Sequence, residues 1–433
     1  MLMQHDSKIM EGVAARIAAA QAARDARVRL LAILAHRTRD LSLAEDALSD
    51  AFALAIEHWS RDGVPTNPEA WLLTAARRRL IDAQRASSAA TRAAAALASD
   101  TMRDGAQARA NLIEAMDMDG AHIPDERLGL LFLCAHPHID EAMRTPLMLQ
   151  SVLGLPAARI ASLFLVSPGT MAQRLVRVKE SIRGQPPRFD PPTPAEVPER
   201  LGAVLRAVYA AFTAGLDHAA EDAHHRGGIG TLGDDAIWLG RMLAEMLPDE
   251  PEVLGLLALM LFSESRRDAR RVGGVYVPLS EQDTGLWNRG LIDEAEQLLL
   301  RAAGMRRHGR LQLEAAIQSA HAARLRSGRT DWAAIVGLYE GLIAIAPSIG
   351  AGVAHAAAVR EVRGDLEAMR LLDTLHSQAG PRVRGYQPYW ATRAVVCDEL
   401  GRAAEATEAW TIAIGLTDDA ATRAWLVEQR DRK

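Results

Sequence analysis

Apolar side chains recur at helical spacing in this chain, and no run of alternating β-branched residues is long enough to predict a sheet. One stripe follows a single helix face at spacings i, i+4, i+7 and i+11: Met171, Leu175, Val178 and Ile182. A second helix is predicted from a cap at Ser42 to about Trp59. Ala, Leu and Arg dominate the composition while aromatic residues make up only 4%, which also favours helices. We therefore expect an all-α fold.

Changes in composition divide the 433 residues into a predicted series of domains. The segment 86–124 begins Ala/Ser-rich and then collects acidic residues, which predicts a linker. The proline-rich segment 185–194 predicts a domain boundary. The predicted domains are a compact helical domain over 8–85, a second small helical domain over 125–184 and a long helical region over 195–433.

The region 195–433 has the pattern of paired helices. Two similar segments begin at Gly364 and Gly401, and their spacing is near the period of about 34 residues that tetratricopeptide repeats show. An earlier helix, Asp331–Ala346, is predicted to end at Pro347 as such a unit would. Diverged tetratricopeptide-like repeats are therefore predicted, and an irregular helical bundle is the alternative.

The charge is unevenly distributed along the chain. The formal net charge is −5, with 22 Lys and Arg against 21 Asp and Glu in residues 1–185, and 28 against 34 in residues 186–433. Like-charge repulsion would keep the acidic second part away from DNA. Two distant cysteines, Cys134 and Cys397, suggest a reducing compartment. No signal-peptide core or membrane-spanning apolar run is present, so a cytoplasmic protein without membrane contact is expected.

The most informative stretch, 157–183, has the pattern of a DNA-binding helix-turn-helix. A short helix over 157–163 leads to a tight turn, after which Ser167 is a predicted N-cap and Pro168 the first helical residue. The apolar stripe of the second helix leaves an open polar face suited to reading a major groove: Thr170, Gln173, Arg174 and Arg177. An ordinary helical hairpin with a solvated face is the alternative.

A second basic cluster lies on the helix that follows the turn-rich loop 61–68. It comprises Arg77, Arg78, Arg79 and Arg85, with Trp71 upstream on the same helix. Basic side chains beside an aromatic ring suit phosphate contact and the support of unstacked bases in single-stranded DNA. Taken alone, this cluster is better explained as a solvated charged face.

Several segments resemble those of bacterial extracytoplasmic function sigma factors, in the order found in that family and over nearly the whole chain. The segments that resemble the conserved second and fourth regions are 44–59, 67–85 and 157–183. Others resemble the subgroup with a tetratricopeptide-like C-terminal extension: 127–140, 247–267, 279–295 and 330–348. The resemblance implies two small helical sigma domains, the second with a helix-turn-helix, followed by a helical-repeat domain.

The resemblance also implies a role for each part. The 44–59 helix would bind core RNA polymerase through Asp46 and Asp50. The loop and helix that follow would recognise and melt the minus-ten element of promoter DNA, with contacts from Asn67, Trp71, Arg77, Arg78, Arg79 and Arg85. The minus-thirty-five element would be read by Ser167, Thr170, Gln173, Arg174 and Arg177. Residues 195–433 would modulate activity through an intramolecular contact or a protein partner.

Two other classes of function stay open at this stage. A helix-turn-helix regulator with a repeat-type sensor domain would bind DNA without docking on polymerase. An enzyme could lie in residues 195–433, for example around His218, His224 and His225. We expect no catalysis and no cofactor, because the phosphate-binding loops and catalytic motifs are missing. A metal site at Cys134, His136 and His138 is less favoured than a buried free cysteine.

Overall fold

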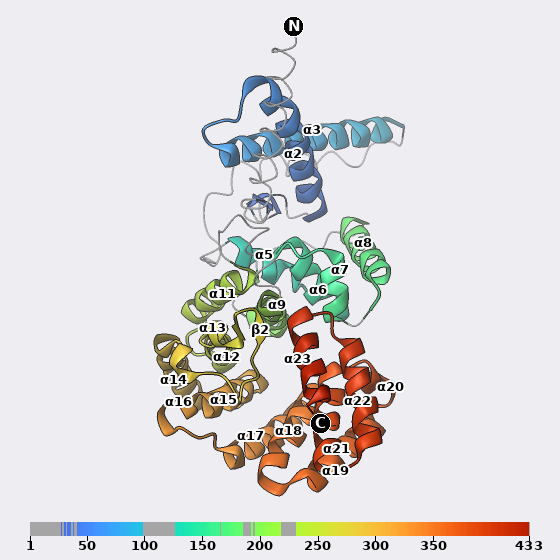
Figure 1. Ribbon diagram of the computed structural model, residues 1–433. Helices are drawn as coiled ribbons and strands as arrows, with labels where there is room; N and C mark the ends of the chain where they lie inside the picture. The colour runs from blue at the N-terminus through green and yellow to red at the C-terminus, as the bar shows by residue number, and fades with distance from the viewer. Residues whose placement is uncertain are drawn as a thin grey trace. The chain divides into compact units, whose positions relative to one another are not determined.

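The described part of the computed structural model is almost entirely helical (Figure 1). It forms two compact units, residues 1–242 and 243–433. The residues that it describes are 27, 30–31, 33–35, 38, 41–97, 126–164, 166–184, 192–193, 195–217 and 231–432. Within these ranges the strands are confined to one antiparallel hairpin, β1 (Arg271–Val272) and β2 (Val275–Tyr276). The predicted all-α architecture is confirmed.

The first unit contains a pair of packed helices, α2 (Leu41–Asp62) and α3 (Pro68–Leu97). The buried face of α2 includes Leu41, Ala44, Leu48, Ala51, Ala55 and Trp59. The Trp59 ring meets the Trp71 ring of α3 edge-on, with 5.5 Å between centroids. Ser42 lies inside α2, so its predicted role as N-cap is wrong. Its hydroxyl makes a tertiary hydrogen bond instead, donating to the Lys179 carbonyl oxygen at 3.2 Å.

The other helices that the structure describes in the first unit are α5 (Glu126–Cys134), α6 (Glu141–Ser151), α7 (Ala157–Leu163), α8 (Pro168–Gly184), α9 (Val197–Asp217) and α11 (Leu232–Met246), the last of which crosses into the second unit. Helix α9 packs against α5, α6 and α7. Its Arg200 is 2% exposed, pairs with Glu196 at 3.4 Å and donates to the Phe132 carbonyl oxygen. Helix α9 thus belongs to the first unit, although the sequence predicts a new domain from residue 195. The domain limits drawn from the sequence stay predictions.

In the second unit, most helices pack against the next one along the chain. After α12 (Pro251–Glu264) and the short α13 (Arg267–Arg270) come the hairpin and a single 3-10 turn, η1 (Thr284–Leu286). The remaining helices are α14 (Arg289–Gly304), α15 (Arg310–Ala322), α16 (Arg324–Ser327), α17 (Trp332–Ile345), α18 (Ile349–Arg363), α19 (Asp365–Ala379), α20 (Pro381–Arg384), α21 (Gln387–Glu399), α22 (Ala403–Leu416) and α23 (Ala420–Asp431).

The two similar segments noted in the sequence occupy equivalent places in successive helix pairs. Gly364 joins α18 to α19 with φ of +86°, and Gly401 lies between α21 and α22 with φ of +72°. Each glycine therefore provides the left-handed backbone of a tight turn between two packed helices. Asp331 caps α17 by accepting from the Ala334 amide, and α17 ends before Pro347 as predicted. Whether these pairs are tetratricopeptide units stays a prediction.

The β-hairpin joins distant parts of the second unit, because β2 packs against α23 (Figure 1). Arg271 donates to the Asp419 carboxylate at 2.8 Å, and the Tyr276 ring meets the Trp425 ring edge-on at 5.7 Å. The second unit is thereby closed by a contact between its early hairpin and its last helix.

Helix α12 is the most buried helix of the second unit and packs on both α14 and α15. Its Gly255 allows the close approach of α15, since a Cβ atom at this position would lie 2.8 Å from the Gln312 backbone nitrogen. At the same contact, the Glu252 carboxylate accepts from the Leu311 and Gln312 amides at the start of α15. The α12–α15 contact therefore depends on a small residue and on an acid at a helix N-terminus.

We expect Gly255→Ala to lower the free energy of unfolding by about 1–3 kcal/mol, because the added methyl group overlaps the backbone of α15. Gly337→Ala in α17 is the matched control, since no atom lies within 4 Å of its added Cβ. That control should be neutral or stabilising by up to about 1 kcal/mol. Urea unfolding followed by circular dichroism measures both, and a neutral Gly255→Ala would contradict the close approach.

Candidate nucleic-acid interface

Helix α8 carries the polar face expected of a recognition helix. Met171, Leu175 and Ile182 are buried and Val178 is half-buried, which confirms the predicted stripe. The exposed residues on the remaining surface include Thr170, Gln173, Arg174 and Arg177. Packing of the apolar stripe on the unit's core thus leaves a polar and basic face in contact with solvent.

The start of α8 is fixed by the predicted cap. The Ser167 hydroxyl accepts from the Thr170 amide at 3.2 Å, and the two hydroxyl groups lie 2.8 Å apart. Helix α7 packs against α8, and the Val166 amide donates to the Ala161 carbonyl oxygen across the connection. The short first helix and the Ser167 cap of the second helix are present as predicted, and the assignment of the two as a helix-turn-helix stays a prediction.

On α3, the basic cluster lies on the solvent side. Arg77, Arg78 and Arg79 are exposed, and Arg79 Nε lies 3.9 Å from the Asp50 carboxylate of α2. The Arg85 side chain is outside the described residues. The exposed acids Asp46 and Asp50 lie one turn apart on α2. Arg79, which is predicted to contact DNA, therefore forms a weak surface pair with Asp50, which is predicted to contact polymerase.

Two of the predicted minus-ten residues have structural roles of their own. The Asn67 carboxamide accepts from the Ala70 amide at 3.0 Å and so caps α3. Trp71 is half-buried and its ring contacts the rings of Trp59 and His58. Its ring supports the α2–α3 contact while part of its surface is left accessible.

Sequence reasoning missed Glu45, which joins α2 to α6 and α8. Its carboxylate accepts from Lys179 Nζ at 2.8 Å and from the Ser151 hydroxyl at 3.0 Å. The side chains of Glu45 and Lys179 are only 13% and 24% exposed. The spacing of Glu45 indicates this role, because it lies four residues after Leu41 and three before Leu48 and so falls on the buried side of α2.

The cysteine and histidines around α5 do not form a metal-binding group. Within the part of the chain that the structure describes, no three His, Cys, Asp or Glu side chains are placed to hold a metal ion. Burial and the nearby Glu45 carboxylate raise the pKa of the Cys134 thiol to about 12, so the thiol stays protonated. The His136 and His138 rings stack at 4.8 Å. The loop with His218, His224 and His225 is outside the described residues.

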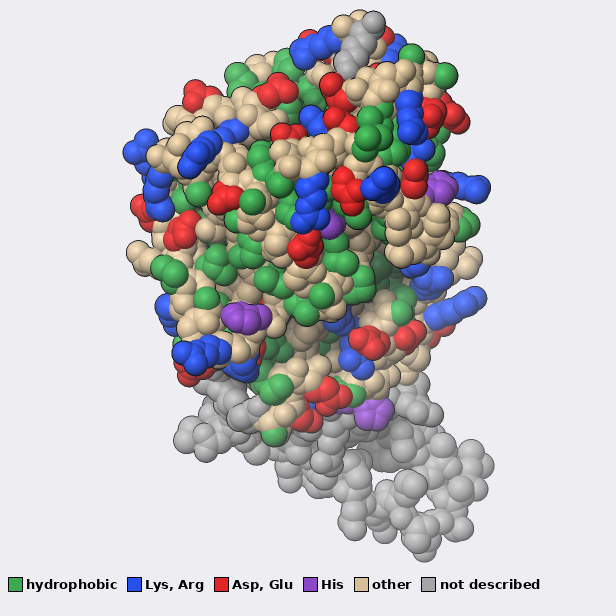
Figure 2. Space-filling model, turned by 90° about the horizontal axis from the view of Figure 1, so that it is seen from below, with side chains coloured by type: hydrophobic (Ala, Val, Ile, Leu, Met, Phe, Trp, Pro, Cys, Tyr) green, Lys and Arg blue, Asp and Glu red, His purple; other side chains and the backbone are tan. Residues whose placement is uncertain are grey.

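Charge is mixed on one face of the molecule. On the face shown in Figure 2, Lys and Arg side chains are interspersed with Asp and Glu side chains. None of the described helices combines the length and apolar character that crossing a membrane requires.

Comparison with known proteins assigns the α2–α3 pair to a known family. Residues 23–90 match the model of sigma-70 region 2, and residues 200–303 match a family of unknown function called DUF6596. An uncharacterized protein of Rhizobium meliloti (strain 1021) is 36% identical over 407 residues, covering 94% of this chain and 93% of the relative. The chain belongs to the sigma-70 family. In this sigma factor the region 2 match precedes the DUF6596 match, as expected of an extracytoplasmic-function-like member with a C-terminal extension. This order confirms the resemblance noted in the sequence.

The family match defines the general role of this sigma factor. Sigma-70 region 2 acts in transcription initiation, and in general it contacts core RNA polymerase and promoter DNA. The matched residues include all of α2 and most of α3, with Asp46, Asp50 and Arg77–Arg79. The DUF6596 match spans most of α9 and runs into α14, so it extends across the boundary between the two units.

We expect Lys179→Met to lower the free energy of unfolding of the sigma factor by about 1–3 kcal/mol, because it leaves the largely buried Glu45 carboxylate without its cation. Arg61→Met is the matched control. It removes a pair with Glu57 whose side chains are 60% and 67% exposed, and such pairs contribute about 0–1 kcal/mol. Chemical denaturation compares the two variants. Equal losses would show that the Glu45 contact does not hold α2 against α8 in solution.

Proposed function

We propose that the protein is a sigma factor that binds core RNA polymerase and directs promoter-specific transcription initiation. The observation that carries this proposal is the sigma-70 region 2 match over the α2–α3 pair, whose exposed faces present acids on one helix and arginines on the other. A DNA-binding regulator that works without polymerase would not need this region, so the match favours the sigma factor.

The polymerase-binding face of this proposal is the exposed side of α2. Asp46 and Asp50 are one helical turn apart and would face the clamp helices of the largest polymerase subunit. The pair between Asp50 and Arg79 spans 3.9 Å at the surface, and such a pair is readily exchanged for a partner's cation.

The minus-ten face of this proposal is formed by the loop before α3 and by α3 itself. Arg77, Arg78 and Arg79 would contact phosphates, and the accessible part of Trp71 would support an unstacked base. Asn67, which fixes the start of α3, and Arg85 complete the proposed set. The minus-thirty-five element would be read by α8 as a recognition helix, through Gln173, Arg174 and Arg177. Ser167 and Thr170, at its N-terminus, would hold phosphate.

The proposed roles of the other parts follow from the same assignment. Residues 8–85 would be the region-two domain, 86–124 the linker and 125–184 the region-four domain. Residues 195–433 would form a tetratricopeptide-like domain that modulates activity through an intramolecular contact or a protein partner. The protein would act by binding, without catalysis or a cofactor, in the cytoplasm where polymerase and promoters meet.

We expect the purified protein to form a complex with core RNA polymerase and to initiate transcription from its promoter in vitro. Reversing charge in Asp46→Lys with Asp50→Lys should weaken the complex about tenfold or more, because it places like charges where attraction is proposed. Glu428→Lys with Asp431→Lys, two reversals on α23, is the matched control. Undiminished co-purification of the first double variant would refute the proposed docking face.

We expect Arg174→Ala and Arg177→Ala each to remove about 1–3 kcal/mol of discrimination for the upstream promoter element. Removing a base-reading side chain lowers affinity for the correct sequence, whereas removing a phosphate-binding side chain weakens binding to all sequences alike. Affinities of the polymerase complex for matched and scrambled upstream elements, measured at fixed salt, distinguish a base-reading side chain from a phosphate-binding one. Arg370→Ala with Arg382→Ala, both exposed in the second unit, is the control. Full promoter affinity in the variant that combines Arg174→Ala with Arg177→Ala would show that α8 is not the recognition helix.

A further inference from the structure

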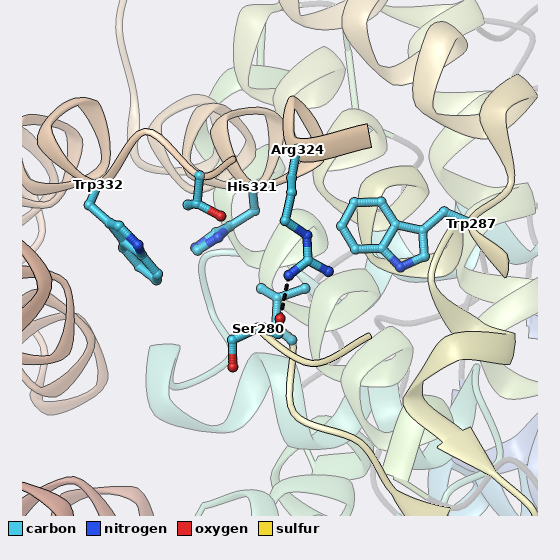
Figure 3. Close-up of a pocket in the computed structure, with 7 residues that line it drawn as sticks. Ser280, Trp287, His321, Arg324 and Trp332 are labelled. Carbon is cyan, nitrogen blue, oxygen red and sulfur yellow. Dashed lines mark hydrogen bonds between the residues drawn. The ribbon is translucent and has the colours of Figure 1, made fainter. Parts of the chain in front are cut away.

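The second unit contains a pocket between the loop after the β-hairpin and the connection from α15 to α17 (Figure 3). It is lined by Leu279, Ser280, Trp287, His321, Arg324, Thr330 and Trp332, and its volume is about 180 Å³. A cavity of roughly 150 Å³ is large enough to hold benzene. The pocket therefore has room for a single ring with a small substituent.

The walls of the pocket include packed aromatic side chains. The Trp332 ring meets the His321 ring edge-on, with 5.5 Å between centroids. On the other side, the Trp287 side chain is 4% exposed and packs beside the Arg324 guanidinium, whose carbon lies 5.1 Å from the ring centroid. Figure 3 shows Arg324 between Trp287 on one side and His321 and Trp332 on the other.

The charge of Arg324 is not neutralised by an acid. Its two terminal nitrogens donate to the backbone carbonyl oxygens of Ser280 and Gln282, at 2.6 and 2.7 Å. These bonds fix the guanidinium in position but leave its full positive charge at the pocket. Among the described residues, Arg324 has no carboxylate within ion-pair distance.

A second arginine lies behind the pocket in a similar state. Arg266 is 5% exposed, and its guanidinium carbon lies 5.9 Å from the same Trp287 ring. One terminal nitrogen donates to the Gln318 side chain, and the other, Nη1, is buried without a hydrogen-bond partner among the described residues. Burial, together with the charges of Arg270 and Arg324, lowers the pKa of Arg266 to about 9.

The histidine in the pocket responds to the same excess of positive charge. Burial, Arg266 and Arg324 together lower the pKa of His321 to about 4, so its ring is neutral at physiological pH. Uncompensated cations at a half-enclosed aromatic pocket are costly unless an anion approaches them. The groups at this site thus favour a ligand that combines negative charge with a flat apolar surface.

We propose that this pocket binds a monocyclic aromatic carboxylate, with its ring against Trp332 and Leu279 and its carboxylate on Arg324. A planar carboxylate matches the guanidinium, which can donate more than one hydrogen bond to it. The ring would gain contacts that a small inorganic anion cannot make, because Trp and His rings favour edge-on or offset neighbours. The proposal concerns the second unit alone and goes beyond the function proposed for the whole chain.

Benzoate is the probe for calorimetric titration of the full-length protein, and benzamide, acetate and inorganic phosphate are the comparison ligands. We expect one site for benzoate and at least tenfold weaker binding of the other three, since benzamide lacks the charge and the two small anions lack the ring. This comparison needs no variant. Equal binding of benzamide and benzoate, phosphate binding as tight as benzoate, or no benzoate binding at millimolar concentration would each overturn the proposal.

Variants locate the site. Arg324→Gln and Trp332→Leu should each weaken benzoate binding at least tenfold, and Trp332→Leu keeps the bonds by which Arg324 holds the loop. Arg326→Gln is the matched control, because Arg326 is on the same short helix but is 63% exposed and pairs with Asp293. Circular dichroism and thermal melting check that the variants fold. Unchanged benzoate affinity in a folded Trp332→Leu protein would place binding elsewhere and overturn the assignment.

Discussion

The burial of apolar stripes on α2 and α8 in the first unit determines which polar side chains of these helices stay exposed. On α8, Met171, Leu175 and Ile182 pack inward, and the period of the helix then directs Arg174 and Arg177 outward. A shift of the stripe by one residue would rotate the whole basic face by about 100°. The candidate DNA contacts therefore depend on hydrophobic packing rather than on any direct interaction among the arginines.

The Glu45 carboxylate adds a polar link to this apolar arrangement. It contacts Lys179 of α8 and Ser151 of α6 while its own side chain is 13% exposed. An acid so placed is favourable only when its partners stay in position, so the contact is sensitive to any separation of α2 from α8. The same carboxylate helps to keep the Cys134 thiol protonated and chemically inert. One residue thus couples the packing of the two candidate DNA-binding parts of this sigma factor.

In the second unit, the charge around one pocket has the opposite sign to the net charge of the surrounding region. Residues 186–433 hold more acidic than basic residues, yet Arg266 and Arg324 lie around Trp287 without acidic partners among the described residues. Backbone carbonyl oxygens and a glutamine satisfy much of their hydrogen bonding but cannot neutralise their charge. A cationic pocket in an acidic region has a local electrostatic character that net charge does not reveal.

The sequence by itself determined the helical class, the capped start of α8 and its buried stripe, because periodicity and capping depend on residues that are near one another in the chain. It also showed that the segments beginning at Gly364 and Gly401 are similar. The tertiary structure decided what depends on residues distant in sequence: the hydroxyl of Ser42 bonds to α8 instead of capping its own helix, and α9 packs with the first unit. The pocket around Arg324 was equally hidden, because its walls come from segments some 40 residues apart that meet only when the helices pack.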